Sequence, residues 1–451
     1  MKKQGTGGRD QGVERAREVV RKRPVSAGPT ASVEAAVAKI TPARLAAFEI
    51  LKLVGENKGH SDELLHSARV DGLSPEDRNL TTALVMGVLR WQIALDARVR
   101  GLLQRPEQRL AEPVAIALRL GAFQLLHLER IPAHAALSES VELCRAAGEP
   151  HATGMVNAVL RKLAAAQKPG VRIHESVAAF AERLGHPRWI VERWVAAYGR
   201  DTALKICEAD QKEPVEGGMF VERGGDWPVM DDGSRLVAEI AAVAVPEAKR
   251  VWDCCAAPGG KTLMLALREP EAEVLATDVS VKRTAAMTTR LGRYGYGDRV
   301  RTGVADASLD GSSQIRGEFD LILCDVPCSG TGTLARNPEI RHHLRPSDLA
   351  RQAERQRALL GAALGRLAPG GRLLYSTCSL EPEENEQVVA SVAVEGVERV
   401  SLEPVLDGLK EQGVLAADAS VQGLVRDGFL RTLPGPGFQG DGFFAGLFVR
   451  S

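Results

Sequence analysis

Two cysteines of the 451-residue chain stand in turns where a thiol can react. Cys328 follows the apolar run DLILCD (320–325), and Cys378 ends the run GRLLYSTC (371–378). Both runs predict strands, and ligands bind at the carboxyl edge of an open parallel sheet, so both thiols and Asp325 should converge on one crevice. A thiolate that adds to carbon 6 of a pyrimidine makes carbon 5 nucleophilic, provided that the base has left its stack. An acid near ring nitrogen 3 stabilises the developing charge, a role suited to Asp325.

The other cysteines indicate neither a disulfide framework nor a metal site. The chain has seven cysteines, and an odd number in a long sequence favours free thiols. It has no CxxC pair, which a zinc-finger site would need, so no metal is expected. Four cysteines are expected to be small buried side chains: Cys144, Cys207, Cys254 and Cys324.

A glycine-rich turn follows the predicted strand RVWDC (250–254) and leads into a helix. Gly259 and Gly260 allow the backbone to approach a ligand closely, and a helix N-terminus carries partial positive charge. The turn is not a P-loop, because that motif requires glycine at the position of Cys255. The dinucleotide pattern GxGxxG is absent from it as well. The turn therefore predicts a nucleoside site without a phosphate-specific loop.

Two acids extend this nucleoside site. Asp278 ends the predicted strand EVLATD (273–278), where an acid typically binds ribose hydroxyls; the alternative is an N-cap of the next helix. Asp306 follows a third predicted strand and could contact an adenine amino group, with a plain loop acid as the alternative. Such a crevice suits S-adenosylmethionine better than a nucleoside triphosphate.

The rest of the sequence predicts the domains that position these residues. Residues 1–38 resemble a basic, solvated tail, with eight Lys/Arg against three acids up to residue 25, a net +5. Residues 39–168 repeat apolar residues every three or four positions and predict an all-helical domain of five to seven helices. Residues 169–235 predict a short connecting segment with one amphipathic helix. Alternating strand and helix patterns in 236–451 predict a doubly wound α/β domain, with 442–450 as its closing edge strand.

Four motifs resemble those of the RsmB/Nop-type (Sun) family of RNA cytosine-5 methyltransferases. Their order and spacing match the family as well as their letters: DCCAAPGGKT (253–262), LCDVPCSGTGTLARNPEIR (323–341), LLYSTCSLEPEENE (373–386) and DGFF (441–444). The stretches 119–145 and 156–163 are similar to the NusB-like domain of bacterial ribosomal-RNA members. The resemblance implies a NusB-like helical domain followed by a Rossmann-like class I S-adenosylmethionine-dependent methyltransferase domain.

The resemblance also implies roles for individual residues. Cys378 would be the nucleophile, and Cys328 would assist release of the methylated base. The residues alone leave these two roles open, because DNA enzymes of similar chemistry use a cysteine that follows proline as the nucleophile. Arg336, Asn337 and Pro338 lie where the family lines the base pocket. The glycine-rich turn, the strand ends and one helix would bind S-adenosylmethionine through Cys255, Ala256, Ala257, Pro258, Gly259, Gly260, Lys261, Asp278, Arg283, Asp306 and Asp325.

The charge balance limits how the chain can bind its partner. Lys+Arg and Asp+Glu are both 58, which excludes strong binding to any nucleic acid through bulk charge. Positive charge is concentrated in residues 336–366, with seven Arg against three acids. The expected partner is RNA, with ribosomal RNA as the leading substrate and transfer RNA or a non-catalytic antitermination role as alternatives. Residues 212–234 lack the Arg-x-Asn signature usual in the family, which implies a reduced RNA-guiding surface.

The expected location follows from two segments that the sequence lacks. It has no run of about 18 apolar residues, so no membrane span is expected. The N-terminus lacks the apolar core of a signal peptide, so a cytoplasmic location is expected. The chain is further expected to be a monomer.

Overall fold

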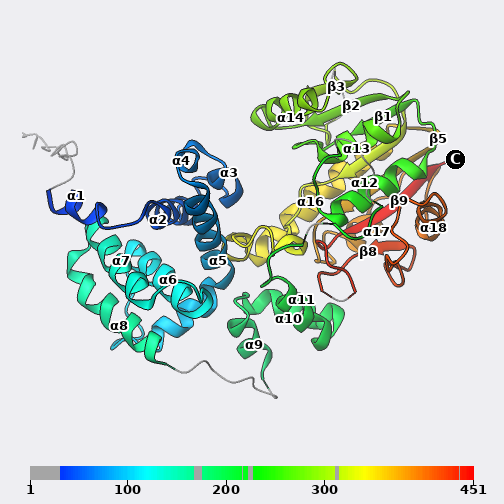
Figure 1. Ribbon diagram of the computed structural model, residues 1–451. Helices are drawn as coiled ribbons and strands as arrows, with labels where there is room; N and C mark the ends of the chain where they lie inside the picture. Colours follow the sequence, from blue (N-terminus) through cyan, green and yellow to red (C-terminus); the bar gives the residue numbers. More distant parts are fainter. Residues whose placement is uncertain (1–30, 167–174, 216, 222–226, 310–313, 436) are drawn as a thin grey trace, which may run out of the picture.

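The N-terminal part of the protein is a bundle of helices, coloured blue to cyan-green in Figure 1. The structure, a computed structural model, describes residues 31–166, 175–215, 217–221, 227–309, 314–435 and 437–451. The helices of the bundle are α1 (Ala31–Val37), α2 (Pro42–Gly55), α3 (Ser61–Leu65), α4 (Ala68–Asp71), α5 (Pro75–Arg100), α6 (Glu112–His127), α7 (Ala133–Ala146), η1 (Pro150–Ala152) and α8 (Thr153–Ala165).

Apolar residues at helical spacing build the core of this bundle. Leu84 and Val88 lie on one side of α5, one turn apart, and both are buried. Gly87 of the same helix faces Phe123 of α6, because a Cβ atom at Gly87 would lie 1.9 Å from the phenyl ring. The described residues between 39 and 168 form seven α-helices, α2 to α8, in agreement with the five to seven predicted.

The end of the expected tail is helical instead. Residues 1–30 lie outside the described residues, but Ala31–Val37 forms helix α1, which packs on α7. Ala36 of this helix is buried. Tertiary packing stabilises a short helix that its own sequence would leave marginal, so the prediction of a tail to residue 38 is wrong for this segment.

The expected connecting segment also contains more structure than its pattern indicates. Phe180, Trp194 and Leu380 are members of a separate apolar cluster that joins this segment to the C-terminal part of the chain. The pattern missed two of the three helices because their few apolar residues pack against residues distant in sequence. In the described residues of this segment the helices are α9 (Val177–Arg183), α10 (Arg188–Tyr198) and α11 (Arg200–Ala209).

The C-terminal part is built on one mixed sheet, which has nine strands among the described residues. Its order is β3-β2-β1-β4-β5-β9-β8-β7, and β6 also pairs with β9. Strands β1 to β5 pair in parallel, whereas β9 is antiparallel to β5, β6 and β8. The strands are β1 (Arg250–Asp253), β2 (Glu273–Asp278), β3 (Val300–Val304), β4 (Phe319–Asp325), β5 (Leu367–Thr377), β6 (Val397–Val400), β7 (Val425–Arg426), β8 (Phe429–Arg431) and β9 (Phe444–Arg450).

Strand β9 corrects one prediction. It lies between β5 and β8, so the expected edge strand at 442–450 is an interior strand. Phe444 and Leu447 are completely buried, in the clusters on opposite faces of the sheet. Such burial is typical of an interior strand, whose two faces are both covered.

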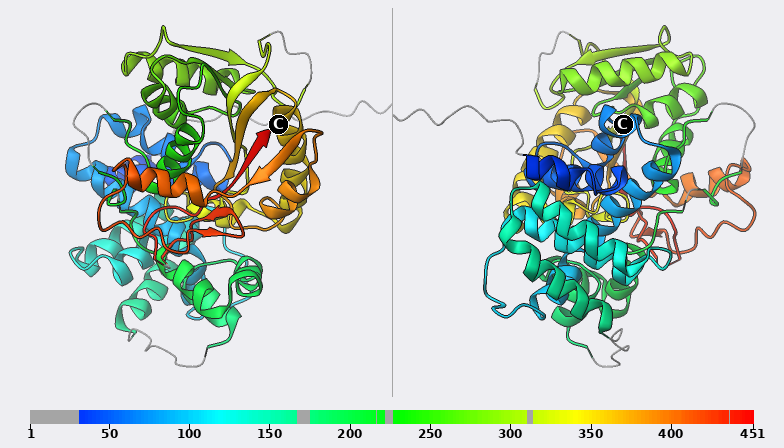
Figure 2. Two further views of the ribbon diagram at one scale, coloured as in Figure 1. Left: turned by 90° about the vertical axis from the view of Figure 1, so that its right-hand side faces the viewer. Right: turned by 60° about the vertical axis from the view of Figure 1, so that its left-hand side comes forward.

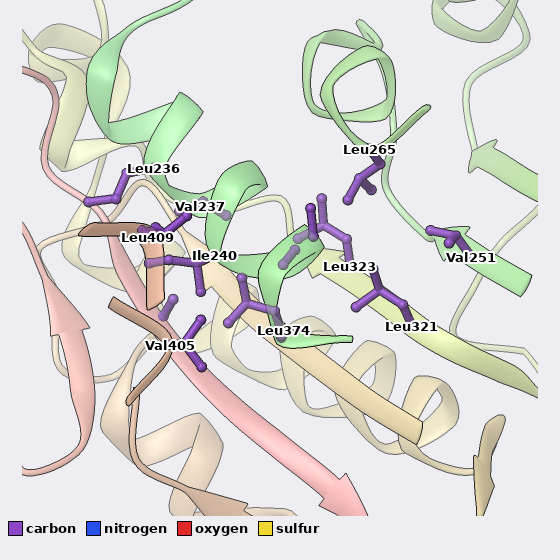
Figure 3. Packing of buried hydrophobic residues seen from close by; sticks show 14 of the residues in the cluster. Leu236, Val237, Ile240, Val251, Leu265, Leu321, Leu323, Leu374, Val405 and Leu409 are labelled. Carbon is purple, nitrogen blue, oxygen red and sulfur yellow. The ribbon is translucent and has the colours of Figure 1, made fainter. Parts of the chain in front are cut away.

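Helices cover both faces of the parallel strands. Leu321 and Leu323 of β4 point to the face covered by α12 and α13, while Ile322 packs on the opposite face with Leu360 of α16. Figure 3 shows Leu321, Leu323 and Leu374 beside the side chains of α12, α13 and α18. The helices are α12 (Asp232–Ala244), α13 (Gly260–Arg268), α14 (Val281–Arg293), η2 (Thr331–Thr333), α15 (Ile340–His343), α16 (Pro346–Leu364), α17 (Glu386–Ser391) and α18 (Glu403–Glu411).

The sheet order places a ligand crevice between β1 and β4. The chain runs from β1 outward to β2 and β3, and then returns to the other side of β1 to form β4 and β5. Ligands bind at such a switch point, outside the carboxyl ends of the strands. Asp253 and Asp325 are the last residues of β1 and β4, so both acids face this crevice. The doubly wound fold predicted from the sequence is confirmed.

The helical bundle reaches the sheet domain through helix α5. Figures 1 and 2 show α5 beside the chain that leads into α16, and Arg90 of α5 donates a hydrogen bond to the Ala335 carbonyl at 2.8 Å. Among the described helices, none is long and apolar enough to cross a membrane.

Candidate active site

The two reactive cysteines lie face to face. Cys328, in the loop after β4, places its Sγ atom 3.2 Å from the Sγ atom of Cys378, at the end of β5. The parallel register of the two strands, with Asp325 opposite Ser376, brings the two loops together. The hydrogen bond with Cys378, together with burial, raises the pKa of the Cys328 thiol well above its ordinary value. The structure thus joins the two thiols in one site.

Gly332 joins the loops that carry the two thiols, and it was not among the predicted site residues. Its amide donates to the Cys378 carbonyl at 2.9 Å, and its carbonyl accepts from the Gly442 amide at 2.7 Å. A Cβ atom at Gly332 would lie 2.1 Å from the Gly442 carbonyl oxygen. Three motif segments therefore meet at one position that only glycine can occupy. The occurrence of Gly332 in a motif was the available signal.

Asp325 is held from both sides by neighbouring side chains. Its Oδ2 atom lies 2.8 Å from the Lys261 ammonium, and its Oδ1 atom accepts a hydrogen bond from the Ser376 hydroxyl at 2.7 Å. Burial alone would lower the pKa of Lys261, but the Asp325 carboxylate outweighs it and raises that pKa. Lys261 also lies 5.1 Å from the centre of the Phe443 ring, so the DGFF motif supports this pair.

The glycine-rich turn lines a cavity of about 170 Å³. Gly259 precedes α13 with a φ of 91°, and a Cβ atom there would lie 2.9 Å from Met287, so the turn requires glycine. The cavity combines backbone with two carboxylates, one ammonium and one guanidinium, and its lining includes Asp253, Cys255, Ala256, Ala257, Pro258, Gly260, Lys261, Arg290 and Asp325. This set of charges fits S-adenosylmethionine, which carries a carboxylate and two cationic groups.

Asp253 was not predicted as a site residue, although it ends β1 beside the cavity. It is buried, and its Oδ2 atom accepts a hydrogen bond from the Thr262 hydroxyl at 2.7 Å. Burial raises the pKa of Asp253 to about 7. Its position at a strand end, like that of Asp278, was the signal that could have identified it.

Asp278 and Arg283 connect the end of β2 to the glycine-rich turn. Asp278 is buried, and its Oδ2 atom lies 3.3 Å from the Arg283 guanidinium, which also donates to the Ala257 carbonyl. The N-cap of α14 is Ser280, so the alternative interpretation of Asp278 as the N-cap is wrong. Asp278 and Arg283 are not part of the cavity lining, although they border the turn that forms it.

Asp306 lies apart from the thiols and the lysine. It is exposed, and its Oδ1 atom accepts hydrogen bonds from the amide and the hydroxyl of Ser308, at 3.0 and 2.6 Å, which lower its pKa. The preceding residue, Ala305, donates to the Asp278 carbonyl at 3.1 Å. This places Asp306 at the edge of the same crevice, beside Asp278.

The remaining cysteines behave as predicted, since all seven are free and four are buried: Cys144, Cys207, Cys254 and Cys324. Among the described residues no group of three or more His, Cys, Asp or Glu side chains could hold a metal ion.

The predicted basic cluster at 336–366 is weaker than its composition indicates. Arg341 is buried and donates to the carbonyls of Arg90, Gly185 and Leu334. Arg336 is engaged by two acids, Asp231 at 3.0 Å and Asp441 at 3.3 Å. Two of the seven arginines therefore stabilise the fold, and fewer remain for RNA phosphates.

Comparison with known proteins agrees with this geometry. The family model of the 16S rRNA methyltransferases RsmB/F matches residues 240–449, and that of the NusB family matches residues 41–165. The chain is 32% identical, over 90% of its length and 98% of the relative, to the probable ribosomal RNA small subunit methyltransferase B of Bacillus subtilis. The chain belongs to the RsmB/F family. It is also 34% identical to ribosomal RNA small subunit methyltransferase B of Xanthomonas campestris, over 76% of this chain and 85% of that one.

Membership of the RsmB/F family confirms the activity and the cofactor expected from the sequence. The family transfers a methyl group to carbon 5 of cytosine in RNA, and S-adenosylmethionine is the methyl donor. The crystal structure of PH0851 has the same fold, with a TM-score of 0.69 and 23% identity over 91% of this chain and 99% of that one.

Proposed function

We propose that this RsmB/F enzyme methylates carbon 5 of a cytosine in 16S ribosomal RNA through a covalent bond between Cys378 and the base. The observation that carries the proposal is the 3.2 Å separation of the Cys378 and Cys328 sulfur atoms beside Asp325. Two thiols can then act on the same base. The names of the relatives, which are small subunit ribosomal RNA methyltransferases, support the choice of substrate.

The chain supplies three chemical groups to the base. The Cys378 thiolate forms a bond to carbon 6, which makes carbon 5 nucleophilic enough to accept the methyl group. Asp325, which lies 2.8 Å from the Lys261 ammonium, would pass a proton to ring nitrogen 3 while the bond to carbon 6 forms, so that no negative charge stays on the ring. After methyl transfer, a water molecule accepts the carbon-5 proton, the double bond between carbons 5 and 6 re-forms, and the Cys378 sulfur leaves carbon 6. Cys328, whose sulfur lies 3.2 Å from that of Cys378, assists this release by donating its proton to the departing sulfur. Cys328 suits the later step because its raised pKa keeps it protonated during the attack.

The glycine-rich turn and the neighbouring strand ends would hold S-adenosylmethionine, which supplies an electrophilic methyl group. Residues 255–261 would contact it through the cavity that they line, and Asp253 and Lys261 would face its charged groups. We assign Asp278 to the ribose hydroxyls, with Arg283 fixing the Asp278 carboxylate. Asp306, at the edge of the crevice, would contact the adenine.

We further propose that residues 39–168 help to grip structured RNA, as a NusB-like domain. The contact between Arg90 and the loop after η2 supports a joint substrate surface of bundle and catalytic domain. All groups of the site come from one chain, which supports action as a monomer. We also propose a cytoplasmic location, because the proposed substrate is ribosomal RNA.

Mapping of 5-methylcytosine with and without the gene tests the substrate. The proposal expects loss of a mark in 16S ribosomal RNA from a deletion strain, restored by the intact gene but not by a Cys378→Ala variant. Loss of a transfer-RNA mark with intact 16S marks would instead favour the transfer-RNA alternative. An unchanged pattern in every RNA would favour a non-catalytic RNA-binding protein.

A further inference from the structure

Glu384 is a completely buried carboxylate that has no role in the chemistry described above. It follows β5, and four donors converge on its two oxygen atoms. The Ser329 amide and the Gln356 amide group donate to Oε1 at 2.9 and 3.1 Å. The hydroxyls of Ser379 and Ser329 donate to Oε2, the first at 2.5 Å. An ionised carboxylate can accept all four hydrogen bonds.

These contacts enclose Cys328 on both sides of its backbone. The backbone amide and the hydroxyl of Ser329, the next residue, both donate hydrogen bonds to Glu384. The carbonyl of Pro327, the preceding residue, accepts a hydrogen bond from the Gln356 side chain at 2.9 Å. Gln356 is itself buried and bonded to Glu384, so the peptides before and after Cys328 are attached to one pair of side chains.

The same carboxylate also reaches the turn that carries Cys378. Ser379 follows Cys378. Its hydroxyl donates a hydrogen bond to Glu384 and accepts one from the Glu381 amide. The hydroxyls of Ser329 and Ser379 lie 3.0 Å apart, which mirrors the contact of the sulfur atoms one residue earlier in each loop. Glu384 therefore links two loops that the chain separates by 50 residues.

We propose that Glu384 is a positioning residue that, with Gln356, fixes the Cys328 and Cys378 thiols relative to each other so that attack and release act on one base. This inference rests on the proposed function and deepens it. A misplacement of about 1 Å at a reacting group can cost about 100-fold in rate, so a rigid link between the loops has a direct catalytic value.

The negative charge of Glu384 provides a second, independent effect. The Cys378 hydrogen bond, burial and the nearby Glu384 charge all raise the pKa of Cys328. Among the described residues, the titratable groups that act on Cys328 include Cys378, Glu384 and Tyr375 of β5. Loss of the Glu384 charge should therefore let Cys328 ionise at lower pH, whereas a purely structural role would leave its ionisation unchanged.

Three variants of the full-length protein distinguish the positioning of the two thiols from the effect of the Glu384 charge. Glu384→Gln removes the charge and replaces one acceptor with a donor, while Gln356→Met removes two hydrogen bonds and keeps the charge. Glu383→Gln is the matched control, because Glu383 is partly exposed and pairs with Arg193, away from the thiols. Two quantities are measured: single-turnover methyl transfer to RNA, and the pH dependence of iodoacetamide labelling at Cys328, read by mass spectrometry of its peptide.

We expect methyl transfer to fall at least about tenfold in both Glu384→Gln and Gln356→Met, with affinity for S-adenosylmethionine unchanged. Labelling of Cys328 should shift to lower pH by roughly one unit in Glu384→Gln only. Wild-type methyl transfer in both variants, or an unshifted labelling profile in Glu384→Gln, would overturn the inference. The labelling experiment needs no RNA, so it remains decisive even if the proposed substrate is wrong.

Discussion

The Sγ atoms of Cys328 and Cys378 lie 3.2 Å apart, although 50 residues separate the two cysteines in the chain. The parallel pairing of β4 with β5 produces this approach, because each cysteine lies just beyond Asp325 and Ser376, which are opposite each other in the register. One base in the crevice can therefore meet both thiols. Attack and release need not involve a large movement of the protein between them.

Replacement of Gly332 by alanine should displace the loops that carry Cys328 and Cys378, although it changes neither cysteine. The new Cβ atom would lie 2.1 Å from the Gly442 carbonyl oxygen and 2.9 Å from that of Cys378, so the backbone must move. We expect methyl transfer to fall about 10- to 100-fold. The free energy of unfolding should fall by about 1–3 kcal/mol, measured by urea denaturation.

Gly154→Ala is the control for this substitution. Gly154 lies in α8, and a Cβ atom there would meet nothing within 4 Å. Alanine favours a helix over glycine by up to about 1 kcal/mol, so this variant should keep its activity and gain slightly in stability. Wild-type activity in Gly332→Ala would show that the close contacts of Gly332 with Cys378 and Gly442 are not needed to hold the thiols in place.

Replacement of Arg341 by methionine should weaken the junction between the helical bundle and the catalytic domain. Arg341 is buried and donates to the carbonyls of Arg90 in α5, Gly185 and Leu334. We expect the free energy of unfolding to fall by about 3 kcal/mol, because buried acceptors lose a charged donor. Urea denaturation, monitored by circular dichroism, measures the change.

The exposed Arg351 of the neighbouring helix provides the comparison. Its side chain is 74% exposed and pairs with Asp348, so Arg351→Met should change stability by less than about 0.5 kcal/mol. Equal effects of the two substitutions would contradict the assignment of Arg341 to the domain junction.

The strands and the reactive thiols could be predicted because their signals are local. Runs such as EVLATD form strands where expected, and the turns that follow them carry the reactive residues. Burial of a charged residue has no local signal. Arg341 was therefore counted with the arginines available to RNA, and Glu384 was not singled out, since their partners lie far away in sequence.

The helices of the connecting segment were missed for a related reason. Helix α9 is seven residues long, and Phe180 in it packs against α10 and the later chain. Such a short helix depends on tertiary contacts, which a periodicity of apolar residues does not reveal. In the same way, the interior position of β9 depends on pairing with β8, a strand of three residues.

Stability should depend on pH through Asp253. Burial raises the pKa of Asp253 to about 7, above the value of about 4 expected in the unfolded chain. Between these pH values the folded state holds a proton that the unfolded state has lost. The contribution of Asp253 to the free energy of unfolding is therefore complete below pH 4 and disappears as the pH rises through 7. Asp253→Asn removes it.

Urea denaturation of both proteins at pH 5 and pH 8 measures this effect. From pH 5 to pH 8, Asp253→Asn should gain about 3 kcal/mol relative to the wild type, since two pKa units correspond to about 2.7 kcal/mol. Thr262 can still donate to the asparagine carbonyl, so the local hydrogen bond is retained. A stability difference that is the same at both pH values would refute the raised pKa.

The most direct test of the account is the covalent adduct between enzyme and RNA in Cys378→Ala and Cys328→Ala, assayed with labelled S-adenosylmethionine and a denaturing gel. We expect Cys378→Ala to show neither methyl transfer nor adduct, and Cys328→Ala to accumulate a methylated protein–RNA adduct that it cannot release. Full activity of Cys378→Ala, or an adduct formed through Cys328, would contradict the assignment of Cys378 as the nucleophile.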